Sequence, residues 1–113
     1  MPAQGHNITN AYEFFCVLSD KPLKSNFTYT KNMIITSVNS DMPKEHKAVM
    51  KQDVADWFIN NFTQENDLIL DPFMGYGTTA ISCIKHNRNY IGCDISEDYV
   101  RLANDRIRNF SLM

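Results

Sequence analysis

The chain has 113 residues, of which 43% are hydrophobic, and a formal net charge of −2. This length suffices for one small domain, and the charge argues against a self-sufficient nucleic-acid-binding domain, which usually presents a basic face. The three cysteines are odd in number and lack C-x-x-C spacing, so neither a disulfide framework nor a metal site is expected. No apolar run approaches the ~20 residues of a membrane span. We therefore expect a cytoplasmic protein with reduced thiols.

The N-terminal third contains only weak structural signals. Residues 1–11 have no periodic pattern, which predicts a flexible arm, and residues 12–113 are predicted to form the domain. Residues 12–18 are mostly aromatic and apolar, which predicts a strand, and residues 33–38 predict a second, short strand.

After Pro43, apolar residues recur at helical spacing. They are Val54, Ala55, Trp57, Phe58, Ile59 and Phe62. Asp53 is the predicted N-cap of this helix. Asn60 and Asn61 are expected on its solvent side, and Trp57 is expected in the core.

The stretch of residues 67–80 predicts a strand, a tight turn and a helix in succession. The apolar residues 68–70 lead into Asp71, and Gly75 and Gly77 follow within the predicted turn. Glycine adopts backbone angles that other residues avoid and lets a ligand approach the main chain. The helix that follows would offer unpaired amides at its N-terminus.

Two classes of ligand use such a turn. The spacing of Gly75, Gly77 and Ala80 satisfies the dinucleotide pattern G-x-G-x-x-G/A, which binds a pyrophosphate. Asp71, however, would place a negative charge at the end of the strand, where it would repel an anion and attract a cationic sulfonium or ammonium group. The residues favour the cationic ligand and leave the dinucleotide as the alternative.

The rest of the chain predicts a helix over residues 78–86, a buried strand over 90–95 and a final amphipathic helix. Ser96 is its predicted N-cap, and Arg106 and Arg108 are expected to stabilise its C-terminal end. Asp94 follows Gly77 by close to the ~20 residues at which an acidic side chain accepts hydrogen bonds from a ribose. A carboxylate that only caps the helix is the alternative.

The segment Asp71-Pro72-Phe73-Met74-Gly75-Tyr76-Gly77-Thr78-Thr79 resembles the S-adenosylmethionine loop of DNA amino-methyltransferases, which methylate adenine N6 or cytosine N4. The resemblance covers about residues 12–108. It implies an α/β, partial Rossmann-like methyltransferase fold with three to four strands, three helices and an incomplete sheet. It also implies S-adenosylmethionine as the cofactor. The implied cofactor-binding residues are Asp71, Pro72, Phe73, Met74, Gly75, Gly77, Thr78, Thr79, Asp94 and Ile95.

His46 is a further implied cofactor residue. It aligns with the first position of the family's His-Pro-Thr-Gln-Lys-Pro segment, which wraps the methionine end of the cofactor. Residues 46–51 lack both prolines of that segment.

The family's catalytic loop, an Asp/Asn/Ser-Pro-Pro-aromatic tetrapeptide that grips a flipped base, has no counterpart in these 113 residues. The resemblance therefore implies the C-terminal, cofactor-binding part of a permuted enzyme, with no catalytic residue of its own. The complete enzyme would bind DNA as its substrate and methylate adenine in preference to cytosine. Such an enzyme would need a complementary catalytic chain or self-association. The alternatives are a non-catalytic interaction module and a dinucleotide-binding fragment.

Overall fold

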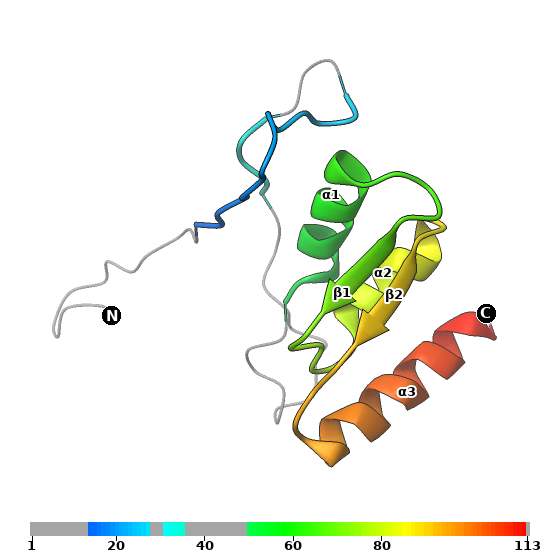
Figure 1. Ribbon diagram of the computed structural model, residues 1–113. Coiled ribbons are helices and arrows are strands. Elements are labelled where there is room, and N and C mark those ends of the chain that lie inside the picture. Colours follow the sequence, from blue (N-terminus) through cyan, green and yellow to red (C-terminus); the bar gives the residue numbers. More distant parts are fainter. Residues whose placement is uncertain (1–13, 28–30, 36–49, 113) are drawn as a thin grey trace, which may run out of the picture.

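The computed structural model describes residues 14–27, 31–35 and 50–112. Helices and strands alternate along the last of these ranges (Figure 1). In chain order the elements are α1 (Gln52–Phe62), β1 (Leu68–Asp71), α2 (Thr78–Lys85), β2 (Asn89–Gly92) and α3 (Glu97–Ser111). This is the expected α/β class. Within the described ranges, no helix is long and apolar enough to cross a membrane.

Strands β1 and β2 pair in parallel, and α2 connects them (Figure 1). Leu68 lies opposite Asn89 at one end of the ladder, and Asp71 lies opposite Gly92 at the other. Because the strands are parallel, their carboxyl ends share one edge of the sheet. The loops that follow β1 and β2 are therefore neighbours.

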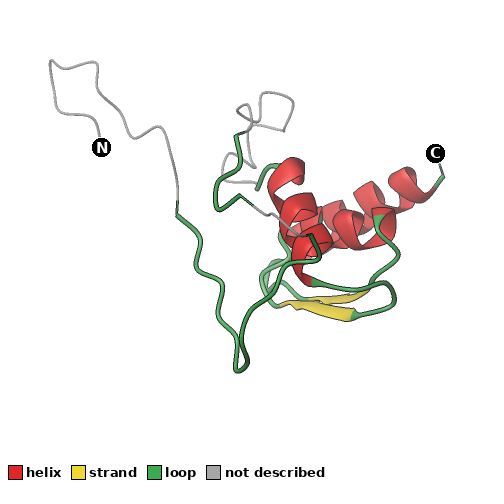
Figure 2. Cartoon of the chain, turned by 90° about the horizontal axis from the view of Figure 1, so that it is seen from above, coloured by secondary structure: helices red, strands yellow, loops and turns green. Residues whose placement is uncertain are grey.

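All three helices lie on one side of this small sheet (Figure 2). The buried apolar residues all lie on these helices and are Val54, Ala55, Ile59, Ala80, Ile81, Cys83 and Ala103. Side chains alternate between the two faces of a strand, and Leu68, Leu70 and Ile91 share the other face. They are 64%, 64% and 51% exposed, so that face of the described sheet is uncovered.

The predicted strand over residues 12–18 is not formed in its described part. Residues 14–18 and 33–35 contain no strand, and the remaining residues of both predicted strands lie outside the described ranges. Phe15 instead packs its ring edge-on against Phe58 of α1, with 5.4 Å between the ring centroids. A strand needs a neighbour for its backbone hydrogen bonds, and the described sheet pairs only β1 with β2. Composition alone could not reveal this.

Helix α1 begins one residue earlier than its predicted N-cap. The N-cap is Lys51, whose side chain makes no capping hydrogen bond, and Asp53 lies in the first turn. The prediction for Asp53 is therefore wrong. Its carboxylate still lies at the positive end of the helix dipole.

Asn61 is buried rather than solvent-facing, which corrects a second prediction. The side-chain NH2 of Asn61 donates to the main-chain carbonyl of Trp57 at 2.7 Å. The main-chain carbonyl of Asn61 accepts from the backbone N–H of Asn26 at 2.7 Å. The segment around Asn26 covers this face of α1 from a distant part of the sequence. Trp57 is half-buried and packs edge-on against Phe58 and Phe62.

The N-terminus of α3 confirms its predicted cap. The Ser96 hydroxyl accepts from the backbone N–H of Tyr99 at 3.2 Å, and Glu97 and Asp98 occupy the first turn. Strand β2 ends at Gly92, before the predicted end at residue 95. Residues 93–95 therefore belong to the loop at the carboxyl edge of the sheet.

Candidate functional site

The loop between β1 and α2 contains two glycines with positive φ. Gly75 has φ of +48° and Gly77 has φ of +85°. A Cβ atom on Gly75 would meet no heavy atom within 4 Å, whereas one on Gly77 would lie 3.3 Å from Cβ of Ala103 in α3. Gly77 thus allows α3 to approach the loop closely. Gly75 leaves the main chain open to an approaching molecule.

Backbone hydrogen bonds fix this glycine loop to the segment after β2. The N–H of Met74 donates to the carbonyl of Cys93 at 2.8 Å, and the N–H of Cys93 donates to the carbonyl of Asp71 at 3.0 Å. The Met74 side chain lies over Gly92, where an added Cβ would come within 2.5 Å of the sulfur. The Met74 side chain therefore packs the loop against the end of β2.

Asp71 occupies the last position of β1, at the carboxyl edge of the sheet. Its Oδ1 accepts from the backbone N–H of Phe73 at 3.0 Å, which closes the first turn of the loop across Pro72. Its negative charge is half-buried beside the glycine loop. The predicted position of a carboxylate at the strand end is confirmed.

Asp94 connects the two loops at this edge. Its Oδ2 accepts from the N–H of Gly75 at 3.0 Å, and its Oδ1 accepts from the N–H of Ser96 at 2.8 Å. Each carboxylate oxygen has two acceptor positions, so both oxygens retain capacity for a further donor. Helix capping and ligand binding are thus compatible roles for this side chain.

Two large apolar side chains stand exposed beside these carboxylates. Phe73 follows β1 and is 87% exposed, and Ile95 follows β2 and is 104% exposed. Both follow strand ends that are paired in the sheet. Together with the open main chain at Gly75, they offer apolar surface and carboxylate acceptors to a ligand with a flat ring and hydroxyl groups.

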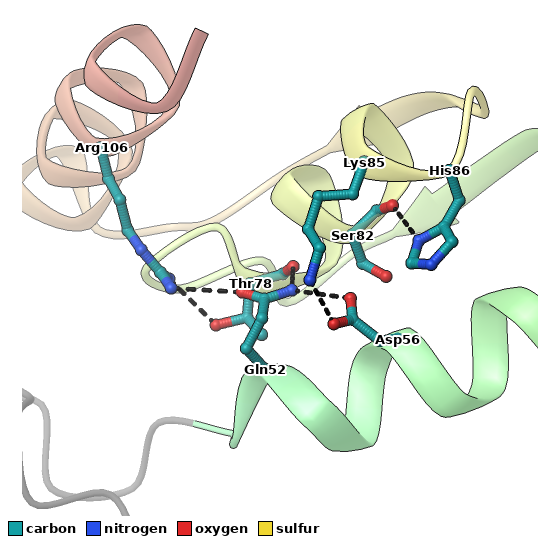
Figure 3. A network of polar contacts seen from close by, with 7 residues as sticks. All are labelled: Gln52, Asp56, Thr78, Ser82, Lys85, His86 and Arg106. Atoms are coloured by element: carbon teal, nitrogen blue, oxygen red, sulfur yellow. Dashed lines mark hydrogen bonds and ion pairs between the residues drawn. The ribbon is translucent and has the colours of Figure 1, made fainter. Parts of the chain in front are cut away.

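Arg106 of α3 points toward Thr78, which follows the glycine loop, and toward Gln52 of α1 (Figure 3). Its Nη1 donates to the carbonyl of Tyr76 at 3.3 Å and to the hydroxyl of Thr78 at 3.1 Å. Its Nη2 donates to Oε1 of Gln52 at 3.3 Å. The guanidinium carbon also lies 4.8 Å from the centroid of the Tyr76 ring. Burial lowers the pKa of Arg106.

These contacts correct the expected role of Arg106 at the C-terminal end of α3. Arg108 lies in the last turn as expected and pairs with Asp105, whereas the Arg106 side chain reaches the loop and α1. The sequence does hold one signal for this inward orientation. Arg106 lies three residues after Ala103, and residues at that spacing share one helix face.

Gln52 and Asp56 extend this polar network from α1 to α2 (Figure 3). Nε2 of Gln52 donates to the carbonyl of Thr78 at 3.1 Å and to Oδ1 of Asp56 at 3.2 Å. Lys85 donates to Oδ2 of Asp56. Burial alone would raise the pKa of Asp56, but the hydrogen bonds from Lys85 and Gln52 and the charge of Lys85 bring it below its usual value of 3.8.

The remaining predicted site residues fall into two groups. Thr78 and Thr79 open α2 directly after the loop, as the sequence predicts. His46 lies outside the described residues, and its role stays a prediction. Gln52, the first residue of α1, donates a hydrogen bond to the carbonyl of Thr78 at the start of α2.

Comparison with known proteins identifies one family. The family model N6_N4_Mtase, described as DNA methylase, matches residues 1–105. The orphan methyltransferase M.BamHII of Bacillus amyloliquefaciens is 39% identical over 69 residues, which cover 61% of this chain and 26% of that protein. The type II beta methyltransferase M.BslI of Bacillus sp. is 34% identical over 113 residues, covering 86% of this chain and 12% of that protein. The chain thus spans about a quarter or less of these curated relatives.

Solved structures give the same result for the fold. The crystal structure of the M1.HpyAVI–SAM complex matches with a TM-score of 0.63 and 32% identity, over 73% of this chain and 40% of that one. PvuII DNA methyltransferase, which is cytosine-N4-specific, matches with a TM-score of 0.62 over 77% of this chain and 40% of its own. Its identity of 19% supports the fold alone.

Proposed function

Because the chain belongs to the N6_N4_Mtase family of DNA methylases, we propose that it is the S-adenosylmethionine-binding part of a DNA amino-methyltransferase. The observation that carries this proposal is the glycine loop, which is open at Gly75 and lies between the carboxylates of Asp71 and Asp94. When bound, S-adenosylmethionine supplies the methyl group. The residues at this edge fit its three chemical parts.

Each part of the cofactor meets a suitable group. Asp94 would accept hydrogen bonds from the ribose hydroxyls, as an acidic residue after the second strand does in related folds. Phe73 and Ile95 would cover the adenine ring and lose their solvent exposure. The negative charge of Asp71 would favour the sulfonium and ammonium groups over a pyrophosphate. Thr78 and Thr79 would present the amides of the first turn of α2, and His46 would reach the methionine end.

We further propose that methyl transfer needs a catalytic part supplied beyond these residues. The sequence has no Asp/Asn/Ser-Pro-Pro-aromatic tetrapeptide. The uncovered sheet face with Leu68, Leu70 and Ile91 supports the same view, because the free energy falls when a second layer covers the apolar side chains of a sheet. A complementary catalytic chain or a second copy would cover this face in the cytoplasm. The substrate of the complete enzyme is the exocyclic amino group of adenine, or less favourably cytosine, in DNA.

Calorimetric titration of the chain with S-adenosylmethionine and, separately, with NAD tests the cofactor. We expect binding of S-adenosylmethionine and no measurable binding of NAD. Binding of NAD alone would replace this proposal with a dinucleotide-binding fragment.

A methyl-transfer assay tests whether catalysis needs a separate chain. The chain, DNA and S-adenosylmethionine with a labelled methyl group are mixed with and without a co-expressed chain that carries an Asp/Asn/Ser-Pro-Pro-aromatic loop. We expect label in DNA only in the combined reaction. Transfer by this chain alone would contradict the need for a separate catalytic part.

A further inference from the structure

We propose that a cavity between α1 and the described N-terminal segments binds an unpaired base of DNA, and that nearby lysines bind the phosphates of the same strand. This inference rests on DNA as the proposed substrate. The cavity is separate from the proposed cofactor site, which lies at the carboxyl edge of the sheet.

The cavity has a volume of about 460 Å³, and the residues that line it include Phe27, Lys31, Met33, Ile35, Trp57 and Asn61. This volume lies within the range of about 300–1,000 Å³ that is usual for ligand-binding pockets. Its wall is apolar and aromatic, with one positive side chain. Such a lining suits a flat ring that is attached to an anionic group.

The cavity lies on a different face of α1 from the one that contacts α2. Gln52 and Asp56, one turn apart, direct their side chains to Thr78 and Lys85 of α2 (Figure 3). Trp57 and Asn61, which line the cavity, are also one turn apart and therefore share a second face of the helix. The packing of α1 on α2 thus leaves the cavity accessible.

Hydrogen bonds hold the opposite wall of the cavity in place. The Asn26 side chain donates to the main-chain carbonyls of Asn60 at 2.9 Å and Thr63 at 2.7 Å. The backbone N–H of Asn26 donates to the carbonyl of Asn61 at 2.7 Å. Asn26 therefore ties the N-terminal segment to the last turn of α1, and the adjacent Phe27 lies across the cavity from Trp57.

The positive side chains of the described residues fall into two groups. Those within and after α2 all have partners in the fold; they are Lys85, Arg88, Arg101, Arg106 and Arg108. Within the same described ranges, no ion pair or hydrogen bond engages the ammonium groups that precede α1, which are those of Lys21, Lys24, Lys31 and Lys51. The net charge of −2 conceals this separation.

These unpaired lysines lie next to the cavity in the sequence or line it. Lys31 is part of the wall, and Lys24 lies three residues before Phe27. Aromatic side chains beside such charges are the combination that binds single-stranded nucleic acid, because bases stack on the rings and phosphates meet the cations. Paired bases stay stacked within a duplex, so a duplex would reach the lysines alone. The site therefore favours an unpaired strand.

Trp57 makes the cavity directly observable, because it is the only tryptophan of the chain. The full chain is titrated at low salt with an oligothymidylate of about 12 nucleotides, within the site sizes of single-strand-binding domains, and with an abasic oligonucleotide of equal length. We expect the thymine strand to quench Trp57 fluorescence and to bind at least about fivefold more tightly than the abasic strand, the lower limit for one stacked base. Equal affinities with unchanged fluorescence would overturn the inference.

Lysine variants test the phosphate contacts. Lys24→Ala and Lys31→Ala should each lower the slope of log Kd against log salt concentration by about 0.7, the value for one phosphate contact on a single strand. Arg101→Ala is the control, because it removes the same charge from an exposed pair with Asp98 on α3. Its slope should equal that of wild type. Equal slopes for all three variants would argue against phosphate binding by these lysines.

Trp57→Leu tests the stacking surface, with binding measured by the anisotropy of labelled strands and folding checked by circular dichroism. A folded variant should lose the preference for the thymine strand over the abasic strand; a retained preference would place the base elsewhere. If this variant does not fold, the fluorescence of the wild type and the lysine variants decide the inference. No S-adenosylmethionine is present in these assays. A chain that binds S-adenosylmethionine but not oligothymidylate would therefore keep the proposed function and overturn the DNA site.

Discussion

Asp94 offers the most direct test of the proposed binding site, because its carboxylate accepts hydrogen bonds from both neighbouring loops. Replacing Asp94 with alanine removes the acceptors of the Gly75 and Ser96 N–H groups, at 3.0 Å and 2.8 Å, together with the proposed acceptor of the ribose. A hydrogen bond to a charged group contributes about 1.5–3 kcal/mol. Losing the ribose contact alone should therefore weaken S-adenosylmethionine binding about 10- to 150-fold.

The Asp94→Asn variant refines this prediction. It keeps one acceptor oxygen and removes the charge, so its affinity should lie between those of wild type and Asp94→Ala. Asp98→Ala is the matched control, because Asp98 lies on the first turn of α3 and its exposed carboxylate pairs with Arg101. Calorimetric titration gives the affinities, and urea unfolding gives the stability of each variant. Wild-type affinity in a folded Asp94→Ala variant would return Asp94 to a purely capping role.

Three further predictions follow from the fold and its charges. Gly77→Ala should lower the free energy of unfolding by at least about 1–2 kcal/mol, the cost of a left-handed residue. The loss should exceed that of Gly75→Ala, because only the Cβ at position 77 would press on α3, at 3.3 Å. Equal urea midpoints for the two variants would contradict this. The lowered pKa of Asp56 means that its carboxylate stabilises the folded state above pH 3.8 and that this stabilisation is lost as the pH falls through the folded pKa. The stability difference between wild type and Asp56→Asn should therefore shrink on acidification below pH 3.8, and a difference independent of pH would refute the assignment. Leu70→Asp, on the uncovered sheet face, should reduce co-purification with a catalytic chain, whereas Leu112→Asp at the exposed end of α3 should not; equal recovery of both complexes would argue against docking at this face.

Local signals were sufficient to predict the C-terminal half of the chain. The apolar run before Asp71 predicted β1, the glycine spacing predicted the turn, and Ser96 with its acidic neighbours predicted the start of α3. These signals work because each feature depends on residues close together in the sequence. Gly77 also needed no tertiary information, since only glycine readily adopts its φ of +85°.

Features that depend on distant contacts could not be predicted in the same way. Asn61 is buried because the segment around Asn26 covers it, and no local pattern reports that contact. Aromatic and apolar residues at positions 12–18 predict a strand, but strand formation requires a partner that the local sequence does not identify, and the described residues 14–18 form none. The local sequence predicts only a helix-dipole role for Arg106, because its acceptors on α1 and the loop lie far away in the sequence.

The contacts described at the glycine loop explain how binding and catalysis can be divided between two parts of an enzyme. The loop is held by Asp94, Cys93 and Arg106, all within this chain. Its geometry is therefore set before any other part arrives, which spares a bound ligand the free-energy cost of ordering the loop. The uncovered face of the sheet lies away from the three helices (Figure 2). A catalytic part that covers Leu68, Leu70 and Ile91 would thus leave in place the residues that form the proposed cofactor site.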